Sequence, residues 1–196
     1  MWMLLLFLAA VPFWQEKGPA EWTDIQIAQF LNDSPWAHPA KAAAGKVVGL
    51  PVQAYLASSK MAEQAEKERN RRAALRRKTE ETPLAEEYRL WFEDNRKENV
   101  ILAVRVGNNT GFSEESEVRH MEEDSAMRSG HIKVKMSSYF PPTASDPYVR
   151  FAFPRSVVQR QETSLDFDLY LPGVPSPFRT VLFIVGDLMV DGKPDF

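Results

Sequence analysis

Four residues near the middle of the chain could, by type and spacing, hold a metal ion. His120, Glu123 and Asp124 would share one face of a helix, and His131 follows just beyond it. Imidazole nitrogens and carboxylate oxygens are common ligands of divalent metals. The spacing matches no established motif such as H-E-x-x-H, and one histidine on an acidic helix is typical of a plain surface. We therefore predict no metal site and no cofactor.

A pair of carboxylates is the second candidate for chemistry. Asp166 and Asp168 lie two residues apart, which places both on one face of a strand, where they could act as a coupled pair in a cleft. They alternate with apolar residues, and this pattern is typical of a strand whose acidic side chains face water. His38 precedes Pro39 in an expected loop and has no obvious partner. We therefore predict no catalytic residue in either place.

The sequence also lacks the motifs of several common enzyme classes. It has no G-x-S-x-G elbow, no S-x-x-K, no P-loop and no G-x-G-x-x-G. It contains no cysteine, which excludes disulfides, thiolate metal sites and cysteine nucleophiles. A hydrolase whose site assembles from residues far apart in the sequence stays open as an alternative.

Residues 60–78 are rich in alanine, glutamate, lysine and arginine and lack an apolar stripe. Glu63 and Lys67 lie at i,i+4 spacing, and acidic residues mostly precede basic ones, as the helix dipole favours. We expect a charged helical arm that lies in solvent and is dispensable for folding. It could also bind another protein or an acidic surface. The candidate partner-binding residues are Arg71, Arg72, Arg76 and Arg77.

Length and composition predict one ordinary domain. The chain has 196 residues, of which 44% are hydrophobic and 26% charged, and its formal net charge is -3. Such a chain can bury a core without metal or disulfide staples. The net charge gives no overall basic field, so no nucleic-acid partner is expected.

The first residues predict export. Residues 1–14 form an apolar, signal-like segment that is too short to span a bilayer, and residues 15–196 are expected to form a single domain. No later segment approaches 18 apolar residues, so we expect no membrane span in the mature chain. The predicted localisation is therefore periplasmic or extracellular.

Periodicity predicts an α+β fold, a mainly antiparallel sheet with helices on one face and the charged arm beside it. Thr23 and Gln26 form a capping-box pattern that begins a helix over 21–32. Further helices are expected over 82–92, after a Thr82-Pro83 cap, and over 113–128, before Gly130.

Alternating apolar residues predict the strands, and Asp191-Gly192 predicts a hairpin turn. The expected strands cover residues 48–54, 100–106, 132–136, 149–153, 165–171 and 179–185. Pro51 predicts that the first of them is an edge or bulged strand. One core is expected to contain Trp36, Trp91, Phe92, Phe151, Phe153, Phe167 and Phe183.

Three blocks of the sequence carry a resemblance to a known family. They are the N-terminal region from Phe13-Trp14 to Ser34-Pro35-Trp36-Ala37, the Phe153-Pro154-Arg155 strand end, and the segment from Asp187 to Lys193. Together they resemble a family of exported proteins from acidobacterial genomes to which no function is assigned. The resemblance implies export and a fold, and no reaction.

Two hypotheses follow from the sequence. The first is a non-enzymatic periplasmic or extracellular interaction or structural module. The second is the unrecognised hydrolase. A deep polar cleft that holds His120, or the Asp166 and Asp168 pair, would favour the hydrolase, and a closed sheet face would favour the module.

Overall fold

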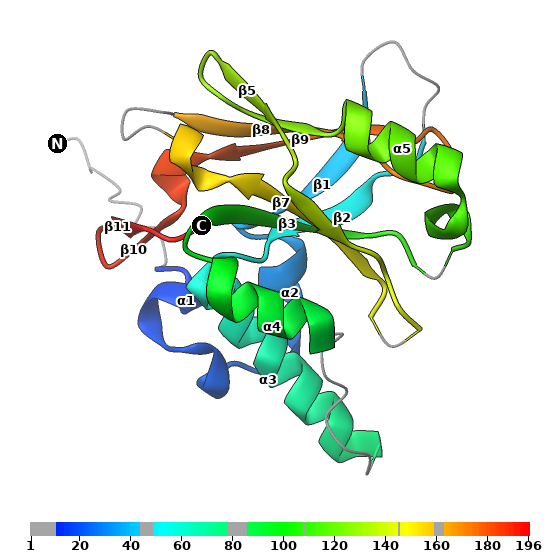
Figure 1. The fold of residues 1–196 in the computed structure, drawn as a ribbon. Coiled ribbons are helices and arrows are strands. Elements are labelled where there is room, and N and C mark those ends of the chain that lie inside the picture. Colours follow the sequence, from blue (N-terminus) through cyan, green and yellow to red (C-terminus); the bar gives the residue numbers. More distant parts are fainter. Residues whose placement is uncertain (1–10, 44–48, 78–85, 108, 145, 159–162) are drawn as a thin grey trace, which may run out of the picture.

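The computed structural model describes residues 11–43, 49–77, 86–107, 109–144, 146–158 and 163–196 (Figure 1). Its main strands are β1 (Ala37–Ala42), β2 (Val52–Leu56), β3 (Asn99–Arg105), β4 (Ala126–Ser129), β5 (Ile132–Lys135), β6 (Ser138–Phe140), β7 (Tyr148–Pro154), β8 (Ser164–Tyr170) and β9 (Phe178–Ile184). They form one curled antiparallel sheet in the order β5-β4-β8-β9-β1-β2-β3-β7-β6. The predicted α+β class with a mainly antiparallel sheet is confirmed.

Strand β1 divides the sheet into two halves. Its residues 37–40 pair with β2, whereas Lys41 and Ala42 pair with β9. We call β2, β3, β7 and β6 the covered half, and β5, β4, β8 and β9 the open half. The two halves face each other across the core, where the rings of Phe153 and Phe167 lie 5.3 Å apart. The curl therefore lets one sheet supply both walls of the hydrophobic core.

Helices cover the outer face of the covered half (Figure 1). They are α2 (Asp24–Asn32), α3 (Lys60–Arg77) and α4 (Glu86–Asn95), preceded by the short α1 (Phe13–Glu16) and η1 (Pro19–Glu21). A fourth long helix, α5 (Glu115–Asp124), packs against the end of β8 in the open half, where Tyr170 donates a hydrogen bond to Glu117 at 3.0 Å. Short 3-10 turns lie at η2 (Gly111–Ser113), η3 (Arg155–Val157) and η4 (Val185–Asp187).

The predicted capping box begins α2. Thr23 accepts from the Gln26 backbone N–H, and the Gln26 side chain accepts from the Thr23 N–H. Ile25 of this helix is 78% exposed. The helix buries Ile27, Phe30 and Leu31.

Several predicted boundaries are wrong. His38 and Pro39 lie in strand β1 and not in a loop. Strand β2 begins after Pro51 and lies between β1 and β3, so it is no edge strand. Helix α5 ends at Asp124, and Gly130 adopts a φ of 57° in the turn between β4 and β5. Positions 48, 82–84 and 108 lie outside the described residues.

The predicted core is largely confirmed. Trp36, Phe92, Phe151, Phe153, Phe167 and Phe183 are all buried in one cluster. Trp91 is only partly buried against it. Phe13 and Trp14, which fall within the predicted signal-like segment, also pack on this core, and Phe13 lies 5.1 Å from Trp22. The packed part of the molecule therefore begins before residue 15.

Helix α3 is not the solvated arm that we expected. Ala62 and Ala65 are fully buried, and Ala74 and Glu66 are 4% exposed. Small alanine side chains let α3 approach α2 and η1 closely, so the helix needs no leucine stripe to pack. The solvated arm was the reason to expect that this helix is dispensable for folding, and its dispensability stays a prediction.

Asp195 caps the first turn of α3 from the far end of the sequence. Its carboxylate accepts from the Ser59 hydroxyl at 2.7 Å and from the backbone N–H groups of Lys60 and Met61. It follows the small hairpin β10 (Met189–Val190) and β11 (Lys193–Pro194), whose turn is the predicted Asp191-Gly192 with positive φ at both residues. Within the described ranges, no helix is long and apolar enough to cross a bilayer.

Candidate functional site

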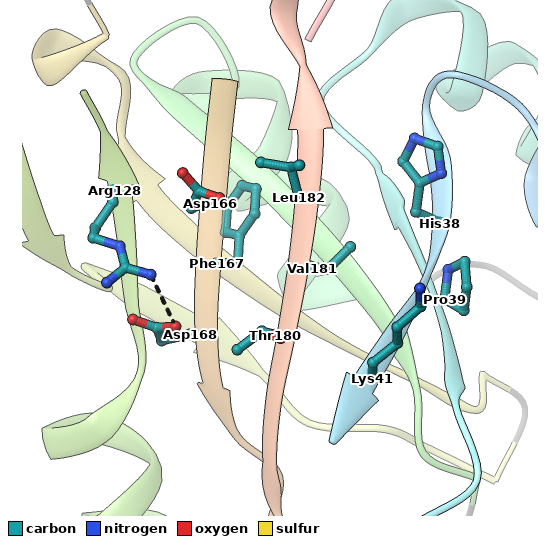
Figure 2. A pocket seen from close by; sticks show the side chains of 10 residues that line it. All are labelled: His38, Pro39, Lys41, Arg128, Asp166, Phe167, Asp168, Thr180, Val181 and Leu182. Carbon is teal, nitrogen blue, oxygen red and sulfur yellow. Dashed lines mark hydrogen bonds and ion pairs between the residues drawn. The ribbon is translucent and has the colours of Figure 1, made fainter. Parts of the chain in front are cut away.

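The outer face of the open half carries a hollow of about 470 Å³ (Figure 2). Strands β1, β4, β8 and β9 contribute its walls. The residues that line it are His38, Pro39, Lys41, Arg128, Asp166, Phe167, Asp168, Thr180, Val181 and Leu182.

Strand register brings these side chains together. Asp166 lies opposite Arg128 on one side and Leu182 on the other. Asp168 lies opposite Thr180, which in turn lies opposite Lys41. Cross-strand partners share a face, so the two carboxylates, both partly buried, project together on the outer side, as their alternation with apolar residues predicted.

The carboxylates of the hollow already have partners. Asp168 accepts from Arg128 at 3.4 Å and lies 3.9 Å from the Lys133 ammonium. Asp166 accepts from the Ser164 hydroxyl at 3.3 Å. Such pairs at a solvent-facing site contribute little to stability, but they neutralise part of the charge in the hollow.

His38 borders the hollow from β1. Its ring lies 5.1 Å from Phe183 of the core, and burial lowers the pKa of the imidazole below its ordinary value. It is therefore neutral at pH 7. Strand β9 stands between His38 and the two aspartates, so they form no acid–base pair (Figure 2).

The histidine of the expected acidic helix stays on the surface. His120 lies 3.7 Å from Asp124, and its ring lies 5.5 Å from Tyr170. His131 lies in the exposed turn between β4 and β5. Among the described residues, no group of three histidine, aspartate or glutamate side chains is placed to hold a metal ion.

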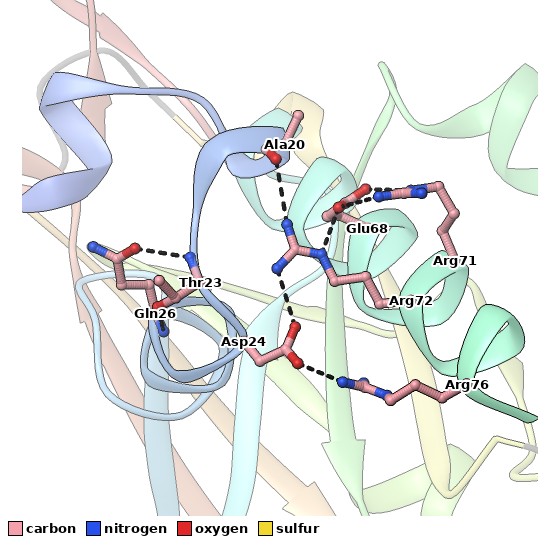
Figure 3. Close-up of polar contacts among 8 residues, drawn as sticks. All are labelled: Ala20, Thr23, Asp24, Gln26, Glu68, Arg71, Arg72 and Arg76. Carbon is pink, nitrogen blue, oxygen red and sulfur yellow. Dashed lines mark hydrogen bonds and ion pairs between the residues drawn. The ribbon is translucent and has the colours of Figure 1, made fainter.

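Three of the candidate partner-binding arginines form ion pairs with carboxylates of the same chain (Figure 3). Arg72 pairs with Glu68 at 2.6 Å and with Asp24 at 3.0 Å, and Arg76 also pairs with Asp24. Arg71 pairs with Glu68 at 2.7 Å. The side chain of Arg77 lies outside the described residues. Arg71 and Arg72 thus form ion pairs within α3, and Arg72 and Arg76 link α3 to the start of α2.

These contacts shift the acidity of their carboxylates. The hydrogen bond from Arg71, with Arg72 beside it, lowers the pKa of Glu68 to about 2. Arg72 and Arg76 lower the pKa of Asp24. The Glu68 pair was visible in the sequence as an i,i+4 spacing, whereas Asp24 lies 48 residues from Arg72, and no local signal connects them.

A buried ion pair joins the helical layer to the covered half. Arg150 of β7 donates to Glu66 of α3 at 2.7 Å, and their side chains are 3% and 5% exposed. Arg150 also pairs with Asp146 and lies 4.6 Å from the centre of the Tyr88 ring. Sequence reasoning missed this cluster, because alternation along β7 placed Arg150 on a wet face.

Comparisons of the chain with protein-family models, with curated proteins and with solved structures found no match. The resemblance to exported acidobacterial proteins therefore stays a prediction. The function has to be argued from the site alone.

Proposed function

We propose that this protein is a non-enzymatic interaction module that binds another protein on the open half of its sheet. The observation that carries the proposal is the uneven coverage of one continuous sheet. Helices α2, α3 and α4 pack over the covered half. Of these helices and α5, the one whose contacts with the open half are described is α5, at the Tyr170 end of β8.

The uncovered surface has the composition of a protein interface. Leu182 and Ile184 are 48% and 44% exposed and share the outer face of β9. Arg128, Asp166 and Lys41 stand around them on the neighbouring strands. An apolar centre with a polar, charged rim is typical of surfaces that bind other proteins. This surface replaces the arginines of α3 as our candidate for partner binding.

The proposal includes export, so that the partner is periplasmic or extracellular. It rests on the apolar segment at residues 1–14. Fractionation of cells that express the gene should find the protein outside the cytoplasm. Full-length protein confined to the cytosol would contradict this part of the proposal without touching the binding surface.

A cross-linking experiment tests the binding surface. A photoreactive phenylalanine analogue at Leu182, introduced in the source organism, should yield a cross-linked product. The same analogue at Leu90 of α4, which is similarly exposed at 51%, serves as the matched control. The partner identified from the product should then bind the purified protein, and Leu182→Asp should weaken that binding at least about tenfold. Equal amounts of cross-linked product at Leu182 and Leu90 would contradict the proposal. So would an affinity for the partner that Leu182→Asp leaves unchanged.

The hydrolase alternative has one observation in its favour. His38, Asp166 and Asp168 line the same hollow. If the hollow were catalytic, Asp166→Asn would abolish hydrolysis in a panel of ester, peptide and glycoside substrates. We expect no Asp166-dependent hydrolysis, because neither carboxylate forms a hydrogen bond to the histidine within the described residues.

A further inference from the structure

Arg179 is a buried cation at the beginning of β9. Its cross-strand partners are Leu169 of β8 and Ala42 of β1. It shares the inner face of the strand with Val181 and Phe183, and the whole residue is 2% exposed. A guanidinium is always charged in proteins, so its burial is unfavourable unless an acceptor or an anion compensates it.

The compensation within the chain is incomplete. One nitrogen, Nη2, donates to the backbone carbonyl of Pro175 at 2.8 Å. The other two, Nε and Nη1, have no hydrogen-bond partner among the residues that the structure describes. Among the described residues, no aspartate or glutamate lies within ion-pair distance of Arg179. Burial alone acts on its pKa, which lies below the ordinary value of arginine.

The contrast with Arg150 makes Arg179 unusual. Both guanidinium groups are almost fully buried, but Arg150 has Glu66 and Asp146 as counter-ions, and these raise its pKa. Folded proteins seldom keep a buried charge without a counter-ion. The missing counter-ion at Arg179 therefore points to a ligand.

The described neighbours of Arg179 are uncharged. A Cβ added to Gly49 would lie 2.7 Å from Nη2 and 3.0 Å from Nη1, so the Gly49 backbone approaches the guanidinium closely. The 172–177 segment, Pro-Gly-Val-Pro-Ser-Pro, contains no acidic residue either. Neutral walls around one cation favour an anion, and the burial restricts it to a small one.

We propose that Arg179 binds the carboxylate or phosphate group of a small molecule through Nε and Nη1. Charge-assisted hydrogen bonds from an arginine are the usual means of holding either oxyanion. The site lies on the inner face of β9, whereas the proposed docking surface lies on its outer face, so this proposal stands independently of the proposed function.

Thermal unfolding at constant ionic strength tests the proposal. Sodium phosphate and sodium acetate are compared with sodium chloride on the full-length protein. Either oxyanion should raise the unfolding midpoint by about 3–6 °C over chloride at ten times its Kd. A rise with phosphate alone identifies a phosphate site, and a rise with acetate alone identifies a carboxylate site. If neither oxyanion exceeds chloride, the proposal is wrong.

Two variants locate the effect. Arg179→Met should abolish the rise, and in chloride it should melt no lower than the parent, because it removes an uncompensated charge. The control Arg105→Met, which changes an exposed arginine of β3, should keep the full rise. Gly49→Ala gives a second test if Arg179→Met does not fold, since its added methyl should reduce the rise. Full retention of the rise in Arg179→Met, or in Gly49→Ala where that variant is the test, would overturn the assignment.

Discussion

The two halves of the sheet are built from the same kind of strand but meet different surroundings. In β3 of the covered half, six consecutive residues from Asn99 to Val104 are buried, because helices lie on one face and the core on the other. In β8 of the open half, buried and partly buried residues alternate from Ser164 to Leu169. The burial pattern of a strand therefore indicates whether helices pack on its outer face.

The ion pairs of the two halves also differ in their exposure to solvent. The covered half seals the Arg150–Glu66 pair away from water, whereas the Arg128–Asp168 pair of the open half has side chains that are 47% and 28% exposed. A buried charge that loses its partner is strongly destabilising, and an exposed one is simply hydrated. The same type of ion pair should thus have unequal effects in the two halves.

The largest expected effect comes from Arg150→Met, which leaves Glu66 buried without its closest cation. We expect the free energy of unfolding to fall by about 3–5 kcal/mol, measured by urea denaturation. The matched change in the open half, Arg128→Met, should cost at most about 1 kcal/mol. Equal losses would remove the distinction between the halves. The double variant Arg150→Met with Glu66→Leu should recover part of the loss, because it removes both charges.

A smaller effect is expected from Asp195→Ala, which removes the acceptor of the Lys60 and Met61 N–H groups, while Ser59 still caps the N–H of Ala62. Loss of an N-cap typically costs about 0.5–2 kcal/mol, and here the Ser59 hydroxyl loses its acceptor too. Circular dichroism during urea denaturation checks the value. Lys193→Ala, an exposed change in β11 of the same hairpin, serves as the control for local effects on the hairpin. A variant as stable as the parent would show that the Asp195 carboxylate does not stabilise α3.

The next effect depends on pH. Arg71 holds the pKa of Glu68 at about 2 in the folded protein, against an ordinary value of 4.5. The unfolded state binds the proton more readily, so the stabilisation is complete above about pH 4.5 and is lost as the pH falls toward 2. Glu68→Gln should flatten the fall of stability across this range, by about 1 kcal/mol or less, in urea titrations at several pH values. If the stability of Glu68→Gln fell between pH 4.5 and 2 as steeply as that of the parent, the ion pair between Arg71 and Glu68 would be contradicted.

The smallest effect on stability is expected in the hollow. Leu182→Ser changes an outward side chain of the open half, so the free energy of unfolding should change by no more than about 0.5 kcal/mol. The same substitution at Leu102, which is fully buried in the covered half, should cost several kcal/mol. A large loss at Leu182 would mean that the outer face of the open half is packed after all.

Local patterns predicted much of the fold. The capping box of α2, the alternation in β8 and the Asp191-Gly192 turn each depend on residues within a few positions of one another. Such features depend on local backbone geometry and on the burial of one face of an element. Both requirements produce regular spacings of residue types in the sequence.

The errors arose where distant segments meet. Alternation placed Arg150 in water, but α3 brings Glu66 to it from 84 residues away. The alanines of α3 looked too small for a core face, and their small size is what permits close packing. The hollow and Arg179 could not be predicted, because strand order decides which side chains share a face and which lack a partner.

The contact between Asp195 and α3 also bears on how the protein is made. Lys60 and Asp195 are separated by 135 residues. At about 5–20 residues per second, the ribosome needs roughly 7 to 27 s to supply Asp195 after Lys60 has been synthesised. Until then the first turn of α3 has unsatisfied N–H groups, and the pairing that closes it is highly non-local, which favours slow folding. The helical layer should therefore complete its docking only after the strands of both halves have been synthesised.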